Sequence, residues 1–130
     1  MTKINQWMIE QIQYCLDRSY DNYTATRYNT TVAACGSGVR HCPGYNRWIE
    51  VRFDGVTLAE IHPFTSQLII RHCDRLLHSS RINAIFREFA DHFRVEQRDN
   101  QTVTVDRHSI WREPDILPLV PGWHTRIGVC

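Results

Sequence analysis

The sequence predicts an α+β fold in which an antiparallel sheet packs against an N-terminal helix and a second helix. Three observations support this class: apolar residues spaced three and four apart near the start, three short strand-like runs separated by turn residues, and a second helical stripe after them. The 130 residues are enough to bury a core without a metal or a disulfide. We therefore expect a single domain over residues 1–130, with a proline-rich extended tail at about 113–130.

The first helix is predicted over Ile4–Leu16, where apolar residues recur every three or four positions and form one stripe. The next segment, Asp21–Val32, is rich in threonine and tyrosine, and these residues favour extended structure. Glycine and proline at positions 36–44 then indicate a loop before the sheet continues.

Three strands are predicted next, at Trp48–Phe53, Val56–Ile61 and Gln67–Arg71. The first two are separated by Asp54-Gly55, a pair typical of a two-residue hairpin turn, so the three runs are expected to form an antiparallel meander. Neighbouring residues of a strand point to opposite faces, so the first strand should have one apolar and one more polar face. The apolar set is Ile49, Val51 and Phe53, and the other is Trp48, Glu50 and Arg52.

A second helix is predicted to begin with Ser79 or Ser80 as its N-cap. Its apolar residues, spaced at three and four, are expected to pack against the sheet. They are Ile82, Ile85, Phe86, Phe89 and Phe93. A hairpin with strands at Phe93–Gln97 and Thr102–Arg107 should follow.

The tail from Glu113 to Cys130 combines three prolines with an unusually apolar composition. Its large apolar residues are Ile116, Leu117, Leu119, Val120 and Trp123. Such a segment is expected to bury itself rather than remain solvated. We therefore predict a symmetric dimer or higher oligomer in which the tail or a sheet edge reaches a second copy, with a tail folded back over its own sheet as the alternative.

Charge and hydropathy exclude several classes of protein. Fifteen lysines and arginines face 14 acidic residues, so the chain lacks the positive field that nucleic-acid binding requires. No apolar run is long enough for a membrane span, and no signal peptide precedes the first helix, so we expect a cytoplasmic protein. Lys3 is the only lysine; the arginine bias reflects either codon usage or a small anionic ligand held by guanidinium groups.

Five cysteines without an export signal are expected to be reduced thiols. A zinc site built from Cys35, Cys42, Cys73 and a histidine is one alternative, but no pair has the close spacing of a zinc knuckle. Structural or incidental cysteines are the preferred interpretation. We therefore expect no metal and no cofactor.

No catalytic motif is recognisable: the chain has no phosphate-binding loop, dinucleotide fingerprint or nucleophile elbow. Glu60 and His62 share a strand face and offer acid–base chemistry, but this spacing is common in proteins without that role. We expect a protein that binds rather than catalyses.

The segment from the sheet through the second helix carries a more specific pattern. It includes the strand run ending in Asp54-Gly55, then Arg81-Ile82-Asn83 at the helix, then Gln97-Arg98-Asp99. Over roughly Tyr28–Val105 this order resembles a group of small phage-encoded proteins, and within it the Thoeris anti-defence proteins. Those proteins act as sponges that bind cyclic ADP-ribose-type immune signals and keep them from a host effector.

The resemblance implies a set of ligand contacts. Asn83 would hydrogen-bond the ligand, Arg98 would meet a phosphate, and Asp99 a ribose or a base edge. Arg52 and Arg27 are looser matches to further contacts. From the residues alone, Asn83 could instead satisfy nearby backbone groups, and Arg98 and Asp99 could simply form a hairpin turn.

The chain departs from the pattern where an aromatic would stack on the ligand. Cys73 lies about ten positions before the asparagine, at the place of that aromatic, and residues 77–80 replace a threonine pair. The stacking side chain would then come from elsewhere. The candidates are His72, Arg75 and Trp111.

These observations predict a non-catalytic phage protein that binds and sequesters a cyclic nucleotide signal in the host cytoplasm, either a cyclic ADP-ribose type or a cyclic oligonucleotide. Its partners would be the small nucleotide and a second copy of the chain, with neither a membrane nor a nucleic acid. The alternative is an inhibitor that grips a host defence protein, such as a nuclease or a CRISPR complex. Aromatic anchors would then lie on an exposed face, with Trp7, Trp48 and Trp123 as candidates.

Overall fold

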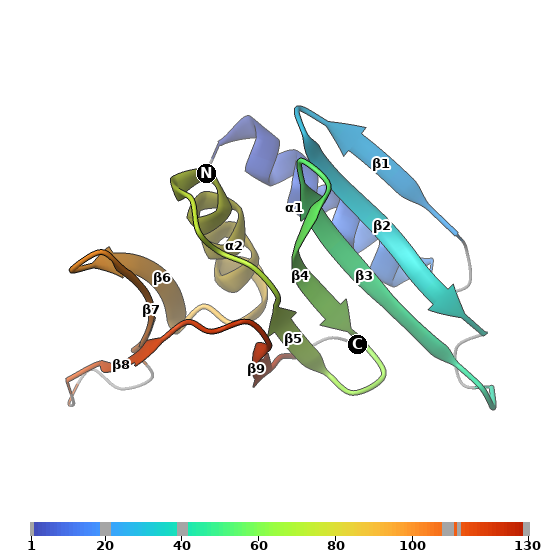
Figure 1. The fold of residues 1–130 in the computed structure, drawn as a ribbon. Helices are drawn as coiled ribbons and strands as arrows, with labels where there is room; N and C mark the ends of the chain where they lie inside the picture. Colours follow the sequence, from blue (N-terminus) through green and yellow to red (C-terminus); the bar gives the residue numbers. More distant parts are fainter. Residues whose placement is uncertain (1, 19–21, 39–41, 108–110, 112, 129–130) are drawn as a thin grey trace.

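A computed structural model gives the fold and describes residues 2–18, 22–38, 42–107, 111 and 113–128. Within these residues, two helices and nine strands form an α+β structure with two antiparallel sheets, as predicted (Figure 1). The elements are α1 (Lys3–Asp17), β1 (Thr24–Arg27), β2 (Thr30–Ser37), β3 (Asn46–Phe53), β4 (Val56–His62), β5 (Gln67–Ile70), α2 (Leu76–Phe89), β6 (Phe93–Arg98), β7 (Gln101–Asp106), β8 (Asp115–Pro118) and β9 (Trp123–Arg126).

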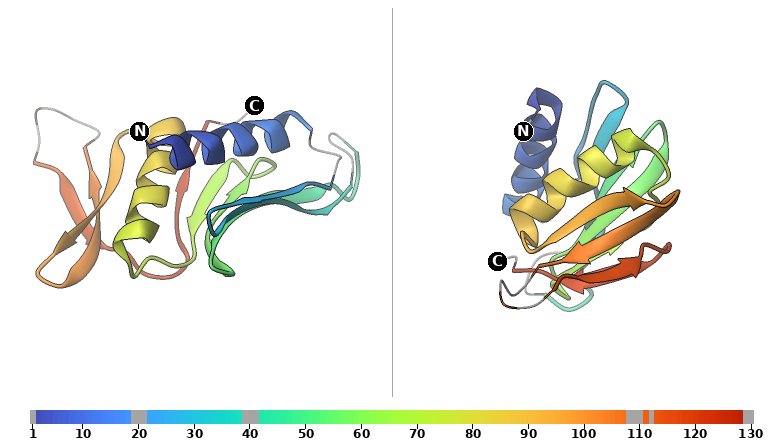
Figure 2. Two further views of the ribbon diagram at one scale, coloured as in Figure 1. Left: turned by 90° about the horizontal axis from the view of Figure 1, so that it is seen from above. Right: turned by 90° about the vertical axis from the view of Figure 1, so that its left-hand side faces the viewer.

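Helix α1 confirms the predicted N-terminal helix and lies across one face of the larger sheet (Figure 2). Thr2 is its N-cap, and its hydroxyl accepts a hydrogen bond from the Asn5 amide at 3.2 Å. The apolar stripe, including Met8 and Ile12, is fully buried against the sheet because this spacing places it on one side of the helix.

The larger sheet has the strand order β1-β2-β3-β4-β5-β9, so the predicted meander forms its centre. Asp54 and Gly55 turn with φ of 49° and 79°, as expected for the hairpin between β3 and β4. The extended segment predicted before them is in fact broken by a second turn at Tyr28 and Asn29, with φ of 48° and 64°. One hairpin, formed by β1 and β2, thus replaces one long extended run.

Alternation along β3 sorts its side chains as predicted. Ile49, Val51 and Phe53 are buried, and Trp48, Glu50 and Arg52 are half-buried on the opposite face. Since Ile49 and Val51 share the core with α1, the polar side chains of β3 lie on the face away from that helix.

The prediction that Ser79 or Ser80 caps α2 is wrong. The helix begins at Leu76 after the extended residue Arg75, and both serines lie inside it. The start is set by packing: His78, in the first turn, is 3% exposed and its ring contacts Phe53. A helix beginning at the serines would leave His78 outside this contact.

The prediction that Phe93 belongs to the helical stripe is wrong, whereas the prediction that it begins the following hairpin is confirmed. It begins β6, because α2 ends at Phe89 and the chain turns at Ala90. Its ring still packs on Phe86, with centroids 5.9 Å apart, which explains why its spacing resembles a helical stripe. Helix α2 lies between the two sheets (Figures 1 and 2).

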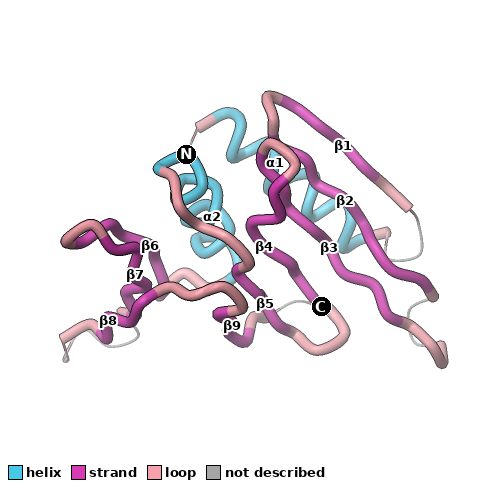
Figure 3. The backbone as a smooth tube through the Cα atoms, in the orientation of Figure 1, coloured by secondary structure: helices cyan, strands magenta, loops and turns pink. Residues whose placement is uncertain are grey.

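The smaller sheet has the order β6-β7-β8 and contains the predicted hairpin, with Asp99 and Asn100 at its turn. The C-terminal tail pairs within its own chain: β8 joins β7, and β9 joins the edge of the larger sheet at β5 (Figure 3). Trp123 fills the space between Phe86 and Phe93. The tail therefore folds back onto its own sheets, while three of its apolar side chains remain exposed: Ile116, Leu117 and Val120.

A single apolar core joins α1, the larger sheet, α2 and Val95 of the smaller sheet. Neither of the helices described, at residues 3–17 and 76–89, is long and apolar enough to span a membrane.

Candidate functional site

Arg81, the first residue of the Arg-Ile-Asn segment, is buried between α1 and β2. It is 5% exposed, and its Nε donates to the Thr30 hydroxyl at 3.1 Å while Nη1 donates to the Asn5 side chain at 2.8 Å. No carboxylate from the described ranges forms an ion pair with it, and burial lowers the pKa of its guanidinium. A positive charge therefore lies behind Asn5, with no acidic counterpart among the residues that the structure describes.

Asn83 joins α2 to the smaller sheet. Its Oδ1 accepts a hydrogen bond from the Val95 amide at 2.7 Å, and its Nδ2 donates to the Val95 carbonyl at 3.1 Å. Val95 belongs to β6, which is an edge strand, so Asn83 satisfies backbone groups that no neighbouring strand reaches. The predicted ligand residue therefore has a clear structural role in the fold.

Two neighbouring pockets meet at Asn83 and Arg87. One, of about 460 Å³, is lined by Thr2, Asn5, Ser80, Asn83, Ala84 and Arg87. The other, of about 290 Å³, is lined by Asn83, Arg87, Asp91, Phe93 and Arg94. We call these nine residues together the α2 groove; pockets of this size are typical of small-molecule sites.

The electrostatics of the α2 groove favour an anion. The N-terminus of α1 opens into it at Thr2, and the first turn of that helix has no acidic residue. Arg87 and Arg94 contribute two guanidinium groups against one carboxylate, Asp91, among the described lining residues.

The guanidinium group of Arg94 is only partly hydrogen-bonded. Its Nε is buried and, among the described residues, has no hydrogen-bond partner. Its Nη2 pairs with Glu96 at 2.6 Å, and Glu96 also pairs with Arg98 at 2.8 Å. The hydrogen bond from Arg98, together with the charges of both arginines, holds the pKa of Glu96 below its usual value. Arg98 is thus linked to the groove through this ion-pair chain.

The remaining predicted residues lie elsewhere. Asp99 occupies the hairpin turn with φ of 51°, the role that turn chemistry alone suggested. Arg27 lies over the ring of Trp7 at 5.6 Å. Arg52 pairs with Glu50 on the face of the larger sheet away from α1. The structure therefore associates Asn83 and, indirectly, Arg98 with one groove, and places Arg27 and Arg52 outside it.

The outer face of the larger sheet carries two carboxylates on adjacent strands. Glu50 accepts hydrogen bonds from Cys35 at 2.8 Å and from Arg52 at 3.2 Å. Burial, reinforced by the Glu50 hydrogen bond, raises the pKa of Cys35 to about 11, so this thiol stays protonated near neutral pH.

Glu60 is the second carboxylate of that face. His62, expected on the same strand face, contacts this carboxylate at 2.8 Å, and Arg71 donates to it at 2.8 Å. Although burial opposes ionisation, hydrogen bonds from Arg71 and His62 lower the pKa of Glu60. An ionised carboxylate of this kind accepts protons but does not supply them near neutral pH.

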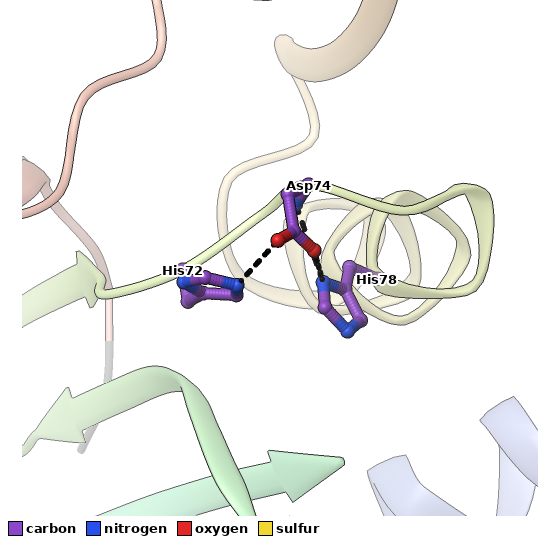
Figure 4. Close-up of side chains that lie close together, drawn as sticks. All are labelled: His72, Asp74 and His78. Atoms are coloured by element: carbon purple, nitrogen blue, oxygen red, sulfur yellow. Dashed lines mark hydrogen bonds and ion pairs between the residues drawn. The ribbon is translucent and has the colours of Figure 1, made fainter. Parts of the chain in front are cut away.

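Sequence reasoning missed a cluster of His72, Asp74 and His78 at the start of α2 (Figure 4). Asp74 lies between the two rings, 3.0 Å from His72 Nε2 and 3.1 Å from His78 Nδ1. The sequence signal for this cluster is His-x-Asp followed four residues later by a second histidine. These side chains come together only because a helix begins between Asp74 and His78. Burial lowers the pKa of His78, while the charge of Asp74 opposes this effect.

The cysteine-based zinc set considered from the sequence does not assemble within the described part of the chain. Cys35 is engaged with Glu50, Cys73 contacts Ser79 at 3.4 Å, and Cys42 is exposed. Histidine and carboxylate, rather than cysteine, form the group of potential metal ligands.

Comparison with known proteins gave no match to a family model, a curated protein or a solved structure. Fold and site define a two-sheet α+β protein with an arginine-lined groove.

Proposed function

We propose that the protein binds a small phosphorylated ligand in the α2 groove and holds it intact. The observation that carries the proposal is the pair of guanidinium groups, of Arg87 and Arg94, that line the groove together with Asn83. The side chain of Arg94 is 43% exposed, and arginine N–H groups bind phosphate oxygens through charge-assisted hydrogen bonds.

The polar groups of the groove suit a nucleotide better than a bare phosphate. The positive end of α1 and the charge of Arg81 behind Asn5 favour phosphate in the larger pocket. Asp91 would repel phosphate and would instead accept hydrogen bonds from ribose hydroxyls. A ligand with separated phosphate and sugar groups uses both parts of the groove.

The resemblance to Thoeris anti-defence proteins extends this proposal to a biological role. A phage protein that sequesters a cyclic ADP-ribose-type signal or a cyclic oligonucleotide needs tight binding and no catalytic group. Of the two segments that carry the resemblance, Asn83 lines the groove, and Arg98 lies outside it but shares the carboxylate of Glu96 with the lining residue Arg94.

Thermal shift and calorimetry with cyclic ADP-ribose, ADP-ribose and cyclic dinucleotides test the proposal. A ligand at 100 times its Kd should add about 2.7 kcal/mol to the free energy of unfolding. We expect Arg87→Gln and Arg94→Gln to weaken binding, and Arg126→Gln, an equal charge change at an exposed β9 residue outside the groove, to leave it unchanged.

Ligand released by heating should have its original mass. Recovery of a chemically altered nucleotide would identify an enzyme instead. Absence of any shift with all these nucleotides, or equal losses in all three arginine variants, would contradict binding in the groove.

Exposed apolar side chains favour a second candidate function, inhibition of a host defence protein. Phe64, Leu76 and Trp111 are 73%, 77% and 89% exposed. The tryptophans named from the sequence are less suitable, because Trp48 stacks on His62 and Trp123 packs between two phenylalanines. Leu76→Ser and Trp111→Ser would abolish capture of a host protein if this function holds, and nucleotide binding would be unaffected.

A further inference from the structure

The side chains of His72, Asp74 and His78 bring one potential metal-ligand atom each into a small volume. Metal–ligand bonds of about 2.0–2.1 Å in a tetrahedron place ligand atoms roughly 3.3 Å apart. Asp74 lies 3.0 Å from His72 and 3.1 Å from His78, each through a different oxygen of its carboxylate, and one ligand atom from each residue lies within 4.8 Å of the others. Binding one ion would require the exposed side chains of His72 and Asp74 to close this spacing.

The cluster combines one rigid ligand with two accessible ones. His78 is 3% exposed, and its ring is held edge-on against Phe53 and against His72. The side chains of His72 and Asp74 are 40% and 60% exposed. Such a site is pre-oriented on its inner side and open to solvent on its outer side.

The Nδ1 atom of His78 has two neighbours from Asp74. The Asp74 backbone amide points its N–H at this nitrogen from 3.2 Å, while an Asp74 carboxylate oxygen lies 3.1 Å away. A neutral ring nitrogen either accepts or donates, so it satisfies only one of these neighbours. A cation would take Nδ1 and the carboxylate as ligands, and the Asp74 N–H would then give up its hydrogen bond to Nδ1.

We propose that His72, Asp74 and His78 bind one divalent transition-metal ion, with zinc as the best fit, and leave at least one coordination position open. Two imidazoles and one carboxylate match the preferences of Zn²⁺ and its neighbours, whereas Ca²⁺ and Mg²⁺ prefer oxygen ligands throughout. The site is separate from the α2 groove and does not depend on what that groove binds.

The open position would face a second small ligand. A pocket of about 180 Å³ lies beside the cluster; His72 and Asp74 line it together with apolar residues of β5 and the tail, among them Ile70 and Leu119. A metal with an open position next to a partly apolar pocket can coordinate a carboxylate or a hydroxyl group of a small molecule.

Equilibrium dialysis of the reduced full-length chain against Zn²⁺, followed by metal analysis, tests the site. The variants are His72→Gln and Asp74→Asn, both at exposed positions, with His124→Gln on β9 as the matched control. We expect wild type and His124→Gln to bind one equivalent of zinc more than the two cluster variants do. Where a cluster variant still binds zinc, its affinity should be at least about tenfold lower than that of wild type, since changes to residues that only support a metal ligand already cause losses of this size. Zinc held by cysteines contributes equally to all four proteins and cancels.

Cobalt provides a second readout. Co²⁺ at this site should give visible absorption without the near-ultraviolet thiolate band, and the absorption should disappear in Asp74→Asn while circular dichroism stays unchanged. Equal zinc uptake by all four proteins, absence of uptake by wild type at micromolar Zn²⁺, or a thiolate band lost with the cluster variants would overturn the proposal.

Discussion

Replacing Asn83 by alanine tests the contact that joins α2 to the smaller sheet. The substitution removes the acceptor for the Val95 amide and the donor for its carbonyl. Val95 is 4% exposed, so water reaches these backbone groups only through the space that the truncated side chain leaves.

The magnitude follows from the two backbone groups left without partners. Each unsatisfied buried group costs about 1–3 kcal/mol, and water entering from the neighbouring pocket reduces that cost. Alanine also favours a helix interior over asparagine by roughly 0.5 kcal/mol. We therefore expect Asn83→Ala to lower the free energy of unfolding by about 2–3 kcal/mol.

Urea unfolding followed by circular dichroism measures this change. The control is Glu10→Ala, an exposed position of α1, which should change stability by no more than about 0.5 kcal/mol. If Asn83→Ala matched the control at an unchanged m-value, the side chain would not hold Val95 in solution, and its structural role would be refuted.

Three further predictions concern the sheet face and assembly. Burial, together with Glu50, raises the pKa of the Cys35 thiol to about 11. Glu50→Gln removes the carboxylate's part of this rise and should speed alkylation of Cys35 at about pH 8; an unchanged rate by peptide mapping would count against this. The folded-state pKa of Glu60 is lowered, so its contribution to the free energy of unfolding is present above about pH 4.5 and is lost as pH falls. Arg71→Gln should lower the free energy of unfolding at pH 7 and make it depend less on pH in the acid range. If urea titrations gave the same pH dependence for the variant and the wild type, the assignment would be contradicted. Light scattering should give a mass above 15.3 kDa, and Leu117→Glu, on the exposed tail strand, should return it to the monomer; a monomeric wild type would refute the predicted oligomer.

Local sequence signals predicted most of the elements. The apolar stripe of α1, the alternation along β3 and the Asp54-Gly55 turn each depend on residues close in the chain, and all three are confirmed. The hairpin around Asp99 follows the same logic. In each case the periodicity or the turn residue specifies the backbone before any distant contact forms.

Contacts between distant segments decided the rest. The beginning of α2 coincides with burial of His78 against β3. Phe93 continues the spacing of the helical stripe although it begins β6, because its ring packs on Phe86 from the strand. Similarly, nothing in the local sequence indicates that β9 completes the edge of the larger sheet.

The candidate sites show the same division. The sequence by itself determined that arginine dominates the cations and that Asn83 follows an arginine by two positions on a helix, but residues two positions apart on a helix point in different directions. Only the tertiary structure decided that Arg81 is buried against Thr30, that Asn83 meets the edge of β6, and that His72, Asp74 and His78 converge. The physical reason is that burial and charge pairing depend on residues up to 76 positions apart, as between Asn5 and Arg81, and those become neighbours only when the helices pack on the sheets.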